Sequence, residues 1–225
     1  MFSSTDPTHV AGARNSGALQ HIISKVRDWL HGEAIEDRAE LMAFLDRNAA
    51  LIAQKCAIDY CRGKAGTFSQ SLFREKPFIE ALTRCRWESY AAILVDLTLI
   101  AETKLIEAAR KLGRAEDLKP ALARLYADTL KAQPVPIHRP DWNDAITAFE
   151  RRQSAFNPAP PPPPDHVILY STRILFESLP IHTNMRKFDE EIVFGAVRFH
   201  SVAFSQRLGA QLRADAVVQS LLNGD

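Results

Sequence analysis

Residues 77–113 read PFIEALTRCRWESYAAILVDLTLIAETKLIEAARKLG, and this segment gives the clearest indication of the fold class. Its apolar side chains recur at steps of three and four residues, which places them on one face of an α-helix. Pro77 suits the first turn, because the amide hydrogen that it lacks has no helical partner there, and Gly113 suits the end. The segment therefore predicts one helix over 77–112, roughly 54 Å long at 1.5 Å of rise per residue.

The same spacing of apolar residues recurs on both sides of this helix. It predicts helices over 16–32, 35–63, 116–131, 142–156 and 165–179, and a second very long one, continuous or in two collinear parts, over 184–222. No Asn-Gly or Asp-Gly turn lies between alternating apolar runs, the usual signal of a β-hairpin. We therefore expect an all-α fold, a helical bundle of seven or eight helices, two of them very long.

Local composition predicts three parts of the chain. Residues 1–15 are small and polar and predict a flexible N-terminal arm, whereas residues 16–225 predict a single all-α domain. Residues 157–164, NPAPPPPP, lack most amide donors and favour a polyproline II connector, with recognition by an SH3-like or WW-like groove as the alternative. Gly63 is expected to end the helix over 35–63 in the left-handed conformation.

Charge and cysteine content exclude several classes of protein. The 28 Lys and Arg nearly balance the 27 Asp and Glu, so no general attraction to nucleic acid is expected. No apolar run approaches the ~20 residues of a membrane crossing, and no cleaved export signal is present near Met1. Cys56, Cys61 and Cys85 are odd in number and form no CxxC pair, which favours a reducing compartment. We expect a cytoplasmic protein that neither binds nucleic acid nor spans a membrane.

The sequence motifs of the common enzyme and metal classes are missing. There is no GxxxxGK[ST] phosphate loop, no GxGxxG, no GxSxG and no HExxH. Most of the basic clusters have acidic residues three or four positions away on the same predicted helix, which is typical of solvated helix faces. We therefore predict no catalytic residue and no metal site, and the sequence assigns no cofactor.

Asp96 is the most informative single residue. Its neighbours three and four positions away on the helix over 77–112 are all apolar, so the carboxylate is expected inside the protein. A buried carboxylate without a partner is destabilising by several kcal/mol. Candidate partners in similarly apolar settings are Arg173, Arg198 and His200. Such a cluster could be an acid and base lining a pocket, or a structural salt bridge that fixes the register of helices.

Three functions remain open at the level of the sequence. The first is a non-catalytic interaction or scaffold protein that forms a homo-oligomer, expected to be a homodimer. Two very long amphipathic helices carry more apolar surface than one small domain covers, and the excess would pair with a second copy. The second is a carrier or sensor of a small apolar ligand held between helices, with Asp96, Arg173, Arg198, His200, Phe194, Phe199 and Phe204 as ligand-binding residues. The third is a helical acid/base enzyme using Asp96 and His200.

Overall fold

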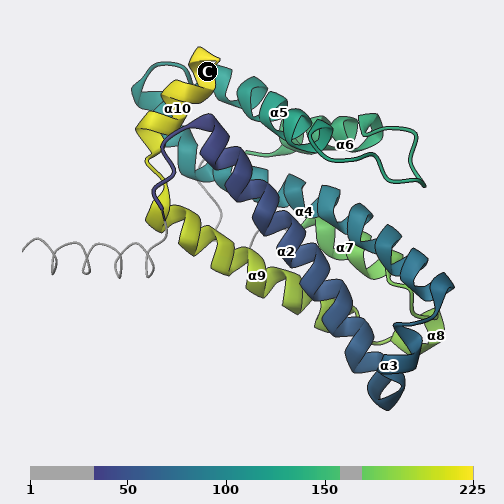
Figure 1. Cartoon of the computed structure of the whole chain (residues 1–225). Helices are drawn as coiled ribbons and strands as arrows, with labels where there is room; N and C mark the ends of the chain where they lie inside the picture. Colours follow the sequence, from purple (N-terminus) through teal and green to yellow (C-terminus); the bar gives the residue numbers. More distant parts are fainter. Residues whose placement is uncertain (1–32, 158–168, 225) are drawn as a thin grey trace, which may run out of the picture. The chain divides into compact units, whose positions relative to one another are not determined.

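The computed structural model describes residues 33–157 and 169–224, and within these ranges the chain is an all-α helical bundle (Figure 1). The helices are α2 (Arg38–Ala65), α3 (Ser69–Leu72), α4 (Lys76–Lys111), α5 (Ala115–Lys131), α6 (Asn143–Ala155), α7 (Tyr170–Ser178), α8 (Thr183–Arg186), α9 (Glu190–Gln211) and α10 (Ala214–Asn223), with a 3-10 turn, η1 (Gly66–Phe68), after α2. The predicted fold class is confirmed. The predicted arm over 1–15, the helix over 16–32 and nearly all of the connector over 157–164 lie outside the described residues.

Helix α4 lies at the centre of the bundle, where α2, α5, α7, α9 and α10 all pack against it. It has 36 residues and matches the helix predicted over 77–112, with Pro77 in its first turn and Gly113 following it at a φ of 68°. Every residue from Ser89 to Glu102 is buried. Because these fourteen residues go four times around the helix axis, α4 is covered on all sides over this length.

The C-terminal half of the bundle differs from the prediction. The prediction of one very long helix over 184–222, continuous or in two collinear parts, is wrong, because the chain forms α8, α9 and α10 with breaks between them. At Leu212 the backbone is extended, and it forms a short parallel β-bridge with Ile35. The Ile35 N–H donates to Gln211 O and the Arg213 N–H donates to Ile35 O, each at 2.9 Å. This pairing with a distant segment ends α9 and directs α10 onto α4 and α5.

Helix α2, with 28 residues, is therefore the second of the two very long helices. It continues past Gly63, which lies inside it, so the prediction that Gly63 ends this helix is wrong. Gly66 follows the last turn instead, with a φ of 53° that suits glycine. Figure 1 shows α9 running alongside α2, and these two helices carry the surface features described below.

Candidate functional site

Asp96 is fully inside the bundle, with only 1% of its surface exposed. Its Oδ1 accepts a hydrogen bond from the backbone N–H of Tyr170 at 3.0 Å, and its Oδ2 accepts one from Ser171 at 2.8 Å. These residues begin α7, so the carboxylate satisfies amides that the start of a helix leaves without partners and lies at the positive end of the helix dipole. Burial raises the pKa of Asp96 to about 6, although the hydrogen bonds and the charge of Arg152 act to lower it.

The predicted burial of Asp96 is confirmed, but the predicted cationic cluster around it is wrong. Arg173 is exposed and its Nε donates to Glu177 at 2.7 Å, and Arg198 is exposed on α9. His200 borders a cleft between α2 and α9 whose lining does not include Asp96. The hydrogen bonds of the carboxylate come from the two backbone amides, and Arg152, which is not among the predicted partners, is the basic side chain whose charge acts on it. A role for Arg173 or Arg198 in binding a ligand stays a prediction.

The three phenylalanines predicted to line a ligand pocket lie at different depths. Phe204 is buried, with its ring centroid 5.4 Å from that of Phe44 in the core. Phe194 is half-buried, whereas 69% of Phe199 is exposed. Successive phenylalanines are five residues apart, which separates them by about 140° around the helix axis. The three side chains therefore do not share one face of the helix. Of these positions, Phe199 is the one that contributes to the outer surface.

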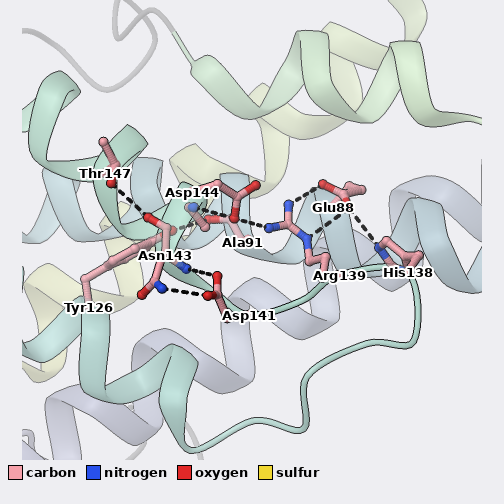
Figure 2. A network of polar contacts seen from close by, with 10 residues as sticks. Glu88, Ala91, Tyr126, His138, Arg139, Asp141, Asn143, Asp144 and Thr147 are labelled. Atoms are coloured by element: carbon pink, nitrogen blue, oxygen red, sulfur yellow. Dashed lines mark hydrogen bonds and ion pairs between the residues drawn. The ribbon is translucent and has the colours of Figure 1, made fainter.

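A polar network joins the loop before α6 to the central helix (Figure 2). Glu88 on α4 accepts hydrogen bonds from Arg139 at 2.5 and 3.0 Å and contacts His138 Nε2 at 2.8 Å. Arg139 also donates to Asp144 at 2.5 Å. Burial acts to raise the pKa of Glu88, but the hydrogen bonds and charges of Arg139 and His138 lower it overall. Because each of these charged groups already has a partner, the network holds the loop in place rather than presenting an acid or a base to a substrate.

Glu102 is a second buried acid on α4 that sequence reasoning missed. Gln153 Nε2 donates to its Oε2 at 3.1 Å, whereas its Oε1 has no partner among the described residues. Burial raises the pKa of Glu102, against the hydrogen bond of Gln153 and the charge of Lys119. The signal was available, because Leu99, Leu105 and Ile106 lie three or four positions from Glu102 in the sequence.

The outer face of α9 is apolar and open to solvent. Ile192 and Phe199 are 64% and 69% exposed, and their spacing of seven residues aligns them along one side of the helix, whereas Phe188, 86% exposed, lies in the turn that precedes α9. We call these three residues the α9 face. Beside it, a cleft of about 410 Å³ lies between α2 and α9, lined by residues from Lys55 to Lys64 and from Asp189 to His200. The α9 face and this cleft together form one of the apolar surfaces available for binding.

Neither a metal centre nor a reactive thiol is found in the described ranges. There, no three or more His, Cys, Asp or Glu side chains are grouped so that they could hold a metal ion. Cys56, Cys61 and Cys85 are buried and carry free thiols, and burial raises the pKa of Cys56 and of Cys61 to about 12. None of the described helices is both long enough and apolar enough to cross a membrane.

No family model, curated protein or solved structure matches this chain. In the bundle, Asp96 is held by structural contacts. Apolar surface is open to a molecule outside the chain at the α9 face, at the cleft beside it, and at a groove of about 830 Å³ where the start of α4 meets the loop before α6.

Proposed function

We propose that this chain is a non-catalytic interaction protein that self-associates through α9. The observation that carries the proposal is the exposure of Ile192 and Phe199 on one side of α9, with Phe188 exposed in the turn before it. Soluble monomers rarely expose contiguous apolar patches of this kind, and burying such a patch against a partner is favourable by about 25 cal/mol for each Å² removed from water. A cytoplasmic location belongs to the proposal, because the free thiols of the three cysteines fit a reducing compartment.

A second copy of the chain is the partner that the charges on α9 favour. Glu191 and Arg198 are exposed on either side of Gly195, and neither makes an ion pair within the described residues. When two α9 helices pack antiparallel with Gly195 at the crossing, Glu191 of each copy lies beside Arg198 of the other. Gly195 is exposed, and a Cβ built there meets no atom within 4 Å, so the helix backbones can approach closely at this point.

The same pairing brings the apolar residues of the α9 face together. Ile192 of one copy lies opposite Phe199 of the other, because the two residues are three before and four after Gly195. A two-fold axis through the crossing repeats every contact, which makes the surface self-complementary and closes the assembly as a dimer. The occupant of this face is therefore proposed to be an identical α9.

Analytical ultracentrifugation at micromolar concentration tests the proposed function. We expect a dimer for the natural sequence and a monomer for Ile192→Ser. Ile137→Ser is the matched control, since Ile137 is fully exposed on the loop before α6 and outside the α9 face. A strict monomer for the natural sequence, or equal dissociation by both variants, would contradict the proposal.

A further inference from the structure

We propose that the cleft between α2 and α9 binds a small amphipathic monocarboxylate, with its apolar chain in the cleft and its carboxylate at the end marked by His200. This site goes beyond self-association and does not depend on it. The side of α9 that lines the cleft faces α2, and Ile192 is the one residue that the cleft shares with the α9 face.

The size and lining of the cleft suit an apolar chain. Its volume of about 410 Å³ falls in the range of roughly 300 to 1,000 Å³ that is typical of small-molecule sites. Cys56 and Gly63 of α2 and Val193 and Ala196 of α9 supply apolar walls. The polar groups lie at the two ends, so that the chemistry of the ends decides where a charged head group is placed.

The cations at the end near Tyr60 are already engaged, including Arg186, whose charge acts on Tyr60 and which donates to the backbone carbonyls of Phe176 and Glu177. Asp189 accepts a hydrogen bond from Tyr60 Oη at 2.7 Å and forms an ion pair with Lys64 Nζ at 2.5 Å. One acid and one base therefore neutralise each other there, and the phenol hydrogen is already donated. A carboxylate placed at this end would have to compete with Asp189 for the same donors.

The end near His200 has one more cation than acid. Lys55 of α2 pairs with Asp59 at 2.7 Å, whereas Arg207, two helical turns from His200 on α9 and outside the cleft lining, donates to Asn48 at 2.7 Å and has no acidic partner within the described residues. His200 makes no hydrogen bond within the described residues; Phe199 contacts its ring edge-on at 5.4 Å between centroids. Burial, and then the charges of Lys55 and Arg207, lower the pKa of His200, while Asp59 opposes this shift. A positive potential and an unused imidazole together favour an anionic head group.

A carboxylate bound at this end changes the protonation of His200. The anion stabilises the imidazolium, so the pKa of His200 rises on binding and the complex takes up a proton. Binding is therefore expected to strengthen as the pH falls from 8 to 6, with Lys55, Arg207 and Asp59 as the other charged groups facing the imidazole. A neutral ligand with the same chain would produce little change.

Isothermal titration calorimetry with decanoate, decan-1-ol and acetate tests the site. We expect decanoate to bind, decan-1-ol to bind more weakly, and acetate not to bind, since it lacks the chain. Ala196→Phe fills the cleft and should abolish decanoate binding, whereas Ala210→Phe, the same change at an exposed position of α9 outside the cleft lining, should leave it unchanged. Circular dichroism confirms that both variants fold.

A second pair of variants locates the head group. Lys55→Gln should weaken decanoate binding about two- to five-fold, as expected for an exposed charge contact, and leave decan-1-ol unaffected. Lys64→Gln, at the opposite end of the cleft, should have no such selective effect. NMR should show the pKa of His200 rising with decanoate and staying constant with decan-1-ol, with Gln substitution of His200 identifying the signals.

Three outcomes would overturn this proposal. The first is that decanoate gives no heat of binding, and the second is that Ala196→Phe and Ala210→Phe lose decanoate binding equally. The third is that Lys64→Gln, and not Lys55→Gln, weakens decanoate binding while leaving decan-1-ol binding unchanged. If Ala196→Phe dissociates the dimer while decanoate does not bind, a second copy fills the cleft, and the ligand site is wrong although self-association holds. If decanoate binds a strictly monomeric chain, the ligand site holds and the proposed function fails.

Discussion

Helices α4 and α9 have similar apolar spacing in the sequence but opposite environments in the bundle. From Ser89 to Glu102, α4 is buried on every side, whereas α9 buries one side and leaves Ile192 and Phe199 in solvent. The surrounding helices supply hydrogen bonds to the buried acids of α4, α7 to Asp96 and α6 to Glu102 Oε2. In α9 the unburied apolar groups are the basis for the proposed contact with a second copy of the chain. Apolar periodicity thus identifies a helix without showing how many of its sides neighbours cover.

Truncation of one apolar side chain on each helix should give the largest difference in stability. Leu97 of α4 is completely buried, so Leu97→Ala is expected to lower the free energy of unfolding by about 3 kcal/mol. Ile192→Ala on α9 is expected to change it by no more than about 0.5 kcal/mol, because the side chain is already in water. Urea unfolding at one fixed, low protein concentration measures both. Similar losses for the two variants would mean that the contrast between the helices is wrong.

The buried carboxylate of α4 should give stability an acid dependence. The pKa of Asp96 in the folded protein is about 6, above the ~3.9 of an unfolded aspartate, so the folded state holds the proton more tightly. This group therefore adds stability as the pH falls from above 6 towards 4, by about 1 to 2 kcal/mol, and that contribution is lost as the pH rises through 6.

Asp96→Asn isolates this contribution from those of other titrating groups. The amide oxygen can still accept a hydrogen bond from the start of α7, but it has no proton to take up. Urea unfolding between pH 4.5 and 6.5 should show that the natural sequence and the variant differ in their free energy of unfolding, and that this difference grows as the pH falls. A pH-independent difference would contradict the raised pKa of Asp96.

Charge reversal on α9 should produce the smallest effect, in the dimer dissociation constant. Glu191→Lys alone and Arg198→Glu alone each place like charges together across the proposed crossing and should weaken dimerisation about two- to five-fold. The double variant restores opposite charges and should recover most of the loss. Sedimentation equilibrium at low salt measures all three. Additive weakening in the double variant would exclude the antiparallel register.

The sequence was sufficient for features set by local chemistry. Pro77 and Gly113 bounded the central helix correctly, and the apolar neighbours of Asp96 predicted its burial. These features depend on residues within one or two helical turns of each other. The α-helical class followed from the same local patterns, repeated along the chain.

Features that depend on distant contacts were not predictable in this way. The extended backbone at Leu212 exists because Ile35, far away in the sequence, pairs with it, and nothing near Leu212 signals this. The partner of Asp96 is a pair of backbone amides at Tyr170 and Ser171, which every residue except proline can supply, so a search for basic side chains could not find them. The cleft beside His200 likewise arises only when α2 and α9 pack together.

Oxidative cross-linking of Gly195→Cys tests the antiparallel α9 dimer at its proposed axis. The three natural cysteines are buried, and burial raises the pKa of each thiol, so the introduced thiol is the exposed one that can react. A disulfide requires Cα atoms within about 7 Å, a distance that two copies reach only close to the helix crossing. We predict a covalent dimer for Gly195→Cys on non-reducing gels and none for Ala210→Cys under the same oxidant. A monomer band for Gly195→Cys, or equal dimer from both variants, would contradict self-association through this face.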